Sequence, residues 1–142
     1  MCVLCEIVAG TAEVSIVHED ADCVAFMALR PIRPGAFIVI PRDHVDHFTD
    51  LSDRLAAHLM VTAQRLGRAM LAAFRPLRVG YVVHGFGVPH AHLNVVPQHD
   101  ALDIISSRHL VADGPVRVSE DAVPLPPRAA LDADAARLRR HL

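Results

Sequence analysis

Two histidines and an asparagine alternate along the segment Val88-Pro89-His90-Ala91-His92-Leu93-Asn94. Alternate residues of a β-strand share one face, so an extended segment would present His90, His92 and Asn94 together. The apolar residues between them could then enter a core. Imidazoles serve as metal ligands, acid–base groups and nucleophiles near neutral pH. The row therefore indicates either a reactive cleft or the solvated face of an amphipathic strand.

Two cysteines, Cys2 and Cys5, stand close together at the start of the sequence. A Cys-x-x-Cys turn can place two thiolates on one tetrahedral zinc ion. The same spacing also occurs in redox pairs and in cysteines with no shared role. A thioredoxin-type pair follows a strand of a βαβ unit, which this motif does not. Metal ligation and unremarkable cysteines stay open as alternatives.

Other groups could contribute to a site. His44 comes shortly after an apolar run that stops at Pro41, and taken alone this position favours a surface histidine. His84 begins a turn that contains two glycines. It could be a cleft residue or a simple turn residue. Cys23 lies in an apolar run and is predicted to be a buried small hydrophobe.

Two arginines, Arg30 and Arg33, flank a proline-rich loop. They could bind phosphate, but a solvated loop is the favoured interpretation. The remaining histidines are interpreted as solvated: His18, His47, His58, His99, His109 and His141.

The elements that must position these residues follow from the hydropathy pattern. Apolar runs predict strands over 13–19, 23–27, 36–40, 79–83 and 91–96. Ser52 can cap a long helix, because apolar residues from Leu55 recur at helical spacing, including Met60, until Pro76. A short final helix is expected over 129–142. Short turns between successive strands indicate an α+β fold, with a mainly antiparallel sheet of about five strands and one or two short helices beside the long one.

Composition restricts the class of protein. The chain has 142 residues, of which 52% are hydrophobic, enough for the core of one domain. A formal net charge of −2 gives no general reason to expect a nucleic-acid partner. No apolar run reaches the ~18 residues of a membrane span. The first residues lack the pattern of a signal peptide, and three cysteines, an odd number, fit a reduced cytoplasmic setting.

The order of motifs resembles the histidine triad (HIT) family. Cys-x-x-Cys, a strand running into Pro-x-x-His, a long helix and Gly-x-Val-Pro-His-x-His follow one another over residues 1–100. Residues 101–142 are expected to form a C-terminal extension, packed on the same domain or swapped with it. The resemblance implies a HIT-like fold, a nucleotide or nucleotide-like ligand and a homodimer.

The resemblance also implies roles for single residues. His92 corresponds to the middle histidine, which attacks an α-phosphate and forms a nucleotidyl-histidine. Such a ring must be neutral, with the proton of its other nitrogen held by a main-chain carbonyl. Zinc-bearing members hold a structural metal at positions that match Cys2, Cys5, His44 and His90.

Several positions depart from the family pattern. Asn94 replaces the third histidine, which is similar to the amide-bearing uridylyltransferase and phosphorylase branches. Ala28 stands where an aspartate often holds the ribose, and Pro34-Gly35-Ala36 lacks a histidine that often follows Pro-Gly. Phe86 and Gly87 stand where a polar pair often contacts phosphate.

The expected substrate contacts are therefore Asn94, Gly87, Phe86 and His84, with His90 and His92 beside them at the catalytic centre. An amide cannot titrate, so Asn94 can donate a neutral hydrogen bond but no proton. The site should consequently favour leaving groups that depart as stable anions.

Three functions fit this pattern. The leading interpretation is a nucleotidyl hydrolase or transferase that acts through His92. The second is a nucleotide-binding module without turnover. The third is a biosynthetic enzyme that uses the zinc and histidine cleft for another small-molecule reaction.

Overall fold

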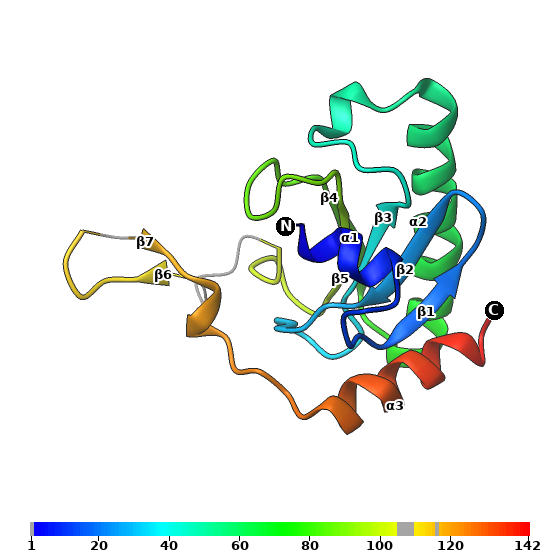
Figure 1. The fold of residues 1–142 in the computed structure, drawn as a ribbon. Helices are drawn as coiled ribbons and strands as arrows, with labels where there is room; N and C mark the ends of the chain where they lie inside the picture. The colour runs from blue at the N-terminus through cyan, green and yellow to red at the C-terminus, as the bar shows by residue number, and fades with distance from the viewer. Residues whose placement is uncertain (1, 105–109, 116) are drawn as a thin grey trace.

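The computed structural model describes residues 2–104, 110–115 and 117–142. An antiparallel sheet of five strands forms its centre, in the order β1-β2-β3-β5-β4 (Figure 1). The strands are β1 (Ile16–Glu19), β2 (Cys23–Met27), β3 (Phe37–Pro41), β4 (Arg78–Val82) and β5 (Leu93–Gln98). With one long helix among the helices of the described residues, this architecture confirms the predicted α+β class.

The long helix α2 (Asp53–Phe74) packs on one face of the sheet. The hydroxyl of Ser52 accepts a hydrogen bond from the main-chain N–H of Leu55 at 3.2 Å, which confirms the predicted cap. The helix ends where Arg75 adopts a left-handed conformation, directly before Pro76. Met60 is 42% exposed, so its predicted place in the apolar stripe is wrong.

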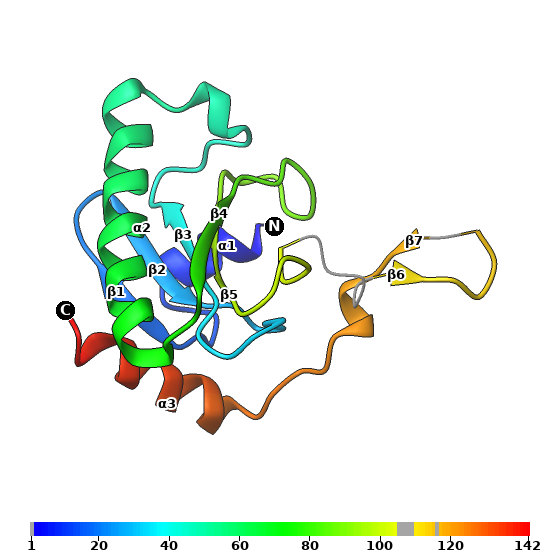
Figure 2. The same ribbon diagram turned by 180° about the vertical axis from the view of Figure 1, so that it is seen from behind.

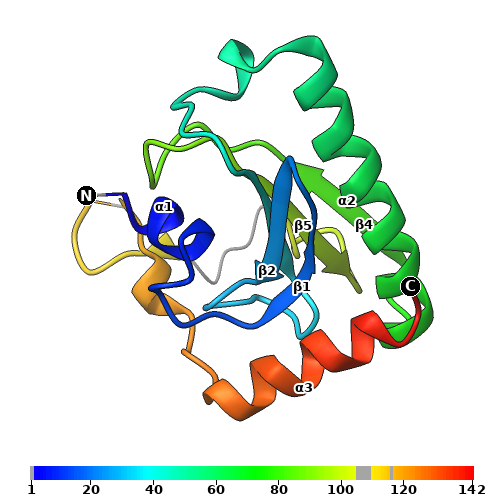
Figure 3. The same cartoon turned by 45° about the vertical axis from the view of Figure 1, so that its right-hand side comes forward.

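The opposite face of the sheet carries a short helix, α1 (Val3–Val8), which was expected to be only a turn. Leu4 and Ile7 of α1 pack against a separate apolar cluster on β2 and β3, formed by Val24, Phe26 and Ile40. Figure 3 shows the sheet between α1 and α2. Tertiary packing stabilises this short helix, because an isolated helix of that length is not stable in water.

Strand β5 begins later and ends later than predicted. His90 and His92 precede it, and it continues through Pro97 to Gln98. Proline is tolerated there because the pairing with β3 ends at the Phe37–Val95 pair, which leaves β4 as the only paired neighbour of that end of β5. The first strand is shorter than predicted, since β1 starts at Ile16.

The segment after β5 returns along the body of the protein. Residues 99–104 are held by Arg33, whose guanidinium lies 2.8 Å from the buried carboxylate of Asp103 and 2.9 Å from Asp100. Arg30 donates to the carbonyl of Val123 and pairs with Asp121. Both arginines therefore attach the C-terminal residues, so neither the phosphate-binding interpretation nor the solvated-loop interpretation describes them.

The C-terminal residues form a small arm and a helix. Strands β6 (Leu110–Val111) and β7 (Arg117–Val118) make a hairpin that projects from the body, as Figures 1 and 2 show. Helix α3 (Arg128–Arg139) packs against β1, β2 and α2, and it adds Leu131, Ala135 and Leu138 to the main core. In the part of the chain that the structure describes, no helix is both long and apolar enough to cross a bilayer.

Candidate functional site

Four side chains of types that can bind a metal ion meet beside α1. Cys2 directly precedes α1, Cys5 lies within it, His44 follows β3 and His90 precedes β5. One ligand atom from each residue lies within 4.8 Å of all the others. The sequence places these residues up to 88 positions apart, and the fold brings them together.

The distances within this cluster fit a tetrahedral zinc ion. The Nδ1 atom of His90 lies 3.5 Å from the Sγ of Cys2 and 3.6 Å from that of Cys5. The Sγ of Cys5 lies 3.2 Å from the Nδ1 of His44. Zinc–sulfur and zinc–nitrogen bonds of ~2.3 and ~2.0 Å at tetrahedral angles separate S and N by ~3.5 Å. The residues present therefore fit the ion that the resemblance implies.

The ring of His90 is oriented by the neighbouring strand. It is fully buried, and its Nε2 atom lies 3.0 Å from the carbonyl oxygen of Pro41. A carbonyl only accepts, so Nε2 carries the proton and Nδ1 directs its lone pair toward the cysteines. Burial lowers the pKa of His90, with the Pro41 carbonyl opposing and His44 and His92 adding to that shift. The ring is thereby kept neutral, as metal ligation requires.

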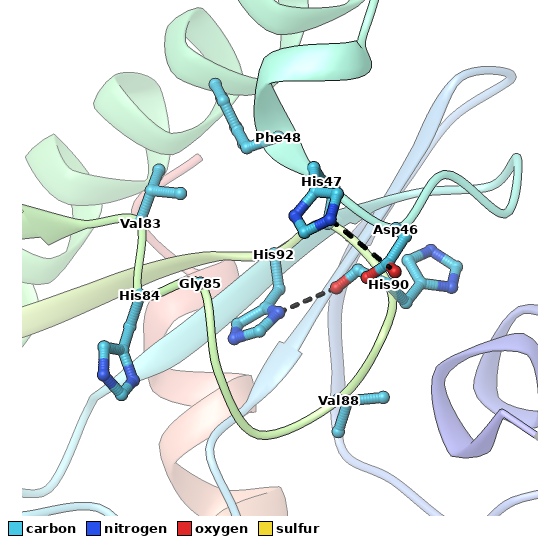
Figure 4. A pocket seen from close by; sticks show the side chains of 10 residues that line it. Asp46, His47, Phe48, Val83, His84, Gly85, Val88, His90 and His92 are labelled. Carbon is cyan, nitrogen blue, oxygen red and sulfur yellow. Dashed lines mark hydrogen bonds and ion pairs between the residues drawn. The ribbon is translucent and has the colours of Figure 1, made fainter.

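The ring of His92 has the opposite arrangement. Its Nδ1 atom donates to the carbonyl oxygen of His90 at 2.8 Å, so in the neutral ring Nε2 carries no proton (Figure 4). The ring lines a pocket between the segment that follows β3 and the turn that follows β4. The lining residues are Asp46, His47, Phe48, Val83, His84, Gly85, Val88, His90, Ala91 and His92. A neutral imidazole with a free nitrogen in a pocket can act as a nucleophile or as a general base.

The predicted substrate contacts fall into two groups. His84 lines this pocket, whereas Phe86, Gly87 and Asn94 do not. Phe86 is 79% exposed and its ring lies near that of His84, and Gly87 occupies the turn with a φ of 104°. The Nδ2 atom of Asn94 donates to the carbonyl of Val82 on β4 at 3.4 Å, so the amide is engaged within the sheet.

The pocket also contains residues that were not predicted. Asp46 and Phe48 were not considered, and His47 was interpreted as simply solvated, although it lines the pocket with a largely exposed side chain. Their position in the sequence could have predicted this. His44 lies beside His90, and His92 is only two residues further along the chain, so the segment after His44 must lie near His92.

A second group of polar side chains surrounds Asp20, in the turn between β1 and β2. Its Oδ2 atom accepts from the Nε2 atoms of His18 at 3.0 Å and His58 at 2.9 Å. The thiol of Cys23 lies 3.5 Å from the same oxygen. The interpretation of His18 and His58 as solvated is therefore wrong, because the turn lies against α2. Cys23 is fully buried as predicted, but it contacts a carboxylate as well as the core.

The charges in this second group follow from the same contacts. Burial would raise the pKa of Asp20, but hydrogen bonds from His18, His58 and two main-chain N–H groups outweigh it and hold that pKa well below its usual range. Burial, together with the charge of Asp20, raises the pKa of the Cys23 thiol to about 12. Asp20 is therefore an anion and Cys23 a neutral thiol near pH 7.

Three comparisons with known proteins agree with this fold. The model of the HIT domain family matches residues 9–101. The protein named "Protein hit" of Bacillus subtilis is 26% identical over 103 residues, covering 69% of this chain and 71% of that protein. An adenosine 5'-monophosphoramidase of Schizosaccharomyces pombe is 28% identical over 99 residues, covering 68% of this chain and 74% of that protein.

Solved structures extend the likeness beyond the family match. A zinc-bound histidine triad family protein from Mycobacterium smegmatis superposes with a TM-score of 0.75. It is 23% identical, and the superposition covers 99% of this chain and 91% of that one. The likeness in fold therefore includes the C-terminal residues that lie outside the family match.

Proposed function

The chain belongs to the histidine triad family, and from that premise we propose that it is a nucleotide hydrolase or nucleotidyltransferase in which His92 is the nucleophile. The observation that carries the proposal is the hydrogen bond from Nδ1 of His92 to the carbonyl of His90. It fixes the tautomer that leaves Nε2 available for attack, on the wall of a pocket. The likeness to an adenosine 5'-monophosphoramidase supports a nucleotide substrate.

The proposed reaction has two steps. The lone pair on Nε2 of His92 attacks the α-phosphorus, a P–N bond forms, and the bond from phosphorus to the leaving group breaks with its electron pair on that group. Water or a second substrate then attacks the same phosphorus. The P–N bond breaks, its electron pair returns to Nε2, and the incoming group releases its proton to solvent. The main-chain carbonyl of His90 stabilises the positive charge that the ring carries between the steps.

The leaving group of the first step is proposed to be one that departs as a stable anion, such as a phosphate or a nucleotide. A phosphoramidate releases an amine, which needs a proton, and Asn94 cannot supply one. The amide of Asn94 also donates to the carbonyl of Val82, which links β5 to β4.

A structural zinc ion on Cys2, Cys5, His44 and His90 is part of the proposal. Four protein ligands close a tetrahedral shell, so no coordination position remains for activating water. The ion would connect α1 to the segments on either side of the pocket. Cys2 and Cys5 are free thiols, as this ligation requires, and the proposed setting is the reducing cytoplasm.

The proposed assembly is a homodimer. Strand β4 is an edge of the sheet, with exposed apolar side chains on it, directly before and after it, and on α2. Val61, Leu71, Leu77, Tyr81 and Val83 are between 37% and 79% exposed. An unprotected edge strand beside an apolar surface is a common place for a second chain to bind.

A nucleotide-binding module without turnover remains a second candidate. Phe86, Gly87 and Asn94 lie outside the lining of the pocket, and Ala28 and Ala36 offer no polar side chain for a nucleotide. Binding without chemistry would place such a protein among regulators or carriers.

Trapping the covalent intermediate distinguishes the two functions. The protein is mixed with a dinucleoside polyphosphate, quenched in alkali, where P–N bonds of histidine persist, and analysed by mass spectrometry. We expect a nucleoside monophosphate adduct on the peptide that contains His92, with no adduct and no turnover in His92→Ala. His141→Ala, just beyond the end of α3, is the matched control. Binding of the nucleotide without adduct or turnover in the wild type would establish the module instead.

A further inference from the structure

The Asp20 cluster, formed by His18, Asp20, Cys23 and His58, contains the donor types of a transition-metal site. Two imidazoles, one carboxylate and one thiol are all ligands that zinc takes in proteins. They come from β1, the β1–β2 turn, the start of β2 and the second turn of α2. The group shares no ligand with the cysteine and histidine cluster beside the pocket.

We propose that the Asp20 cluster is a second binding site for a zinc-class divalent metal ion, independent of the site at Cys2 and Cys5. His18, Asp20 and Cys23 each offer one donor atom, and the three atoms lie within 4.8 Å of one another. His58 donates to the same carboxylate oxygen from α2 at 2.9 Å, but its ring nitrogens lie outside the group of three, so it would have to move to become a fourth ligand.

The distances from Asp20 Oδ2 to the other donor atoms are close to those that a tetrahedral ion imposes. Bond lengths of ~2.0 Å to nitrogen and oxygen and ~2.3 Å to sulfur give edges of ~3.3 Å for N–O pairs and ~3.5 Å for S–O pairs. The thiol of Cys23 lies 3.5 Å from Asp20 Oδ2, and the two imidazole nitrogens lie 3.0 and 2.9 Å from it. For His18 and Cys23, the distance to this oxygen would change by only ~0.3 Å or less when the ion binds.

The carboxylate is already oriented for such a role. Its second oxygen, Oδ1, accepts from the main-chain N–H groups of Asp22 and Cys23, both at 2.9 Å. Oδ2 is thereby directed toward the histidines and the thiol. Hydrogen bonds to the outer oxygen of a ligating carboxylate are the usual support around metal sites.

Binding exchanges protons for the ion. The imidazole nitrogens of His18 and His58 that donate to Asp20 lose their protons or transfer them to Nδ1, and the Cys23 thiol releases its proton to solvent. The metal receives one electron pair from each donor, and nothing is oxidised or reduced. Metal affinity at this site should consequently rise with pH.

One neighbouring group opposes the ion and gives the proposal a sharp test. The guanidinium of Arg65, on α2, lies 3.2 Å from both ring nitrogens of His18. A cation at that distance repels a divalent metal. Arg65 has an exposed side chain, so it can turn outward when the ion binds. Replacing it by glutamine should tighten binding by about fivefold, whereas a cluster that only binds protons gains nothing.

The experiment is cobalt and zinc loading of the full chain, stripped of metal under reducing conditions. We expect about two equivalents per chain in the wild type and about one in His18→Gln and in His58→Gln, with His141→Gln as the control. The double variant Cys2→Ser/Cys5→Ser should still bind one equivalent, at the Asp20 cluster. The cobalt complex of this variant should show a sulfur-to-cobalt absorption band, and the band should vanish when Cys23→Ser is added. Far-UV circular dichroism checks that each variant is folded.

Two results would overturn the proposal. One is a wild-type chain that binds a single equivalent, all of it lost in Cys2→Ser/Cys5→Ser. The other is a second equivalent that persists in folded His18→Gln and His58→Gln and does not tighten in Arg65→Gln. Neither result tests whether His92 is the nucleophile, because trapping of the covalent adduct tests that role separately.

Discussion

His90 and His92 are two positions apart in the sequence, and they are held as opposite tautomers. His90 carries its proton on Nε2, against the carbonyl of Pro41, and His92 carries its proton on Nδ1, against the carbonyl of His90 itself. The main chain therefore assigns one ring to the cysteines and the other to the pocket. Two histidines with the same spacing could not take these roles without such acceptors.

Removal of the proposed zinc should destabilise the fold near the pocket. Cys5→Ser leaves three ligands, and we expect the free energy of unfolding to fall by several kcal/mol, because metal binding to a folded site stabilises it. Val3→Ala, between the two cysteines, should change stability by about 0.5 kcal/mol or less. Thermal unfolding and elemental analysis of both variants make the measurement. A zinc-free Cys5→Ser protein as stable as the wild type would contradict the structural role.

Asn94→His should change the preference for leaving groups. A third imidazole can supply a proton, so kcat/KM for nucleoside phosphoramidates should rise by about 10²-fold, while anionic leaving groups should be affected much less. The measured quantity is the ratio of the two kcat/KM values in both proteins. An unchanged ratio in two active proteins would show that Asn94 does not set the preference. The bond to Val82 suggests the matched control Asn94→Gln, which keeps an amide.

Attachment of the C-terminal residues should depend on pH through Asp103. Burial would raise the pKa of this carboxyl, but Arg33 and two main-chain N–H groups hold it below the ordinary value of 3.8. A lowered folded-state pKa gives stability that is present above the unfolded value and is lost as the pH falls below it. Asp103→Asn should therefore cost about 2 kcal/mol at pH 7 and progressively less below about pH 4.

The control for Asp103 is Asp121→Asn, which removes the exposed partner of Arg30. The side chain of Asp121 is 88% exposed, so this change should cost about 0.5 kcal/mol or less. Urea unfolding of both variants between pH 7 and pH 3 separates the two. Equal, pH-independent losses would show that the Arg33–Asp103 pair has no special part in holding residues 99–104.

The homodimer should dissociate when a charge enters its proposed surface. Val61 is 63% exposed on α2, and Val61→Lys should shift the protein toward monomer, because an unpaired charge is costly in an apolar interface. Leu29→Lys, a change of the same kind in the loop after β2, should leave the mass of the sedimenting species unaltered. Sedimentation velocity over a range of concentrations gives the comparison. A wild-type protein that is monomeric at all concentrations would remove this part of the proposal.

Local signals in the sequence predicted part of this molecule well. The cap at Ser52 and the proline at position 76 defined α2 to within one or two residues, since both act through neighbouring main-chain atoms. Strand β3 differs from its predicted range by one residue at each end. Helix α1 was missed because its stability comes from packing on β2 and β3, which the residues of α1 do not reveal by themselves.

Contacts between distant segments account for the other differences. His18 and His58 look like solvated histidines until the β1–β2 turn is placed against α2. Arg33 gives no sign of its partner 70 residues later. The metal-binding residues were identified through the resemblance, and their roles as ligands stay predictions, although the fold brings all four together.

The packing of α3 on β1 has a consequence for how the protein is made. The hydroxyl of Ser15 donates to Asp132, a contact that joins residues 117 positions apart. During synthesis, the first strand leaves the ribosome long before the helix that covers it, and contacts of such separation form late. The face of β1 and β2 that α3 covers should therefore stay accessible to chaperones until α3 has emerged.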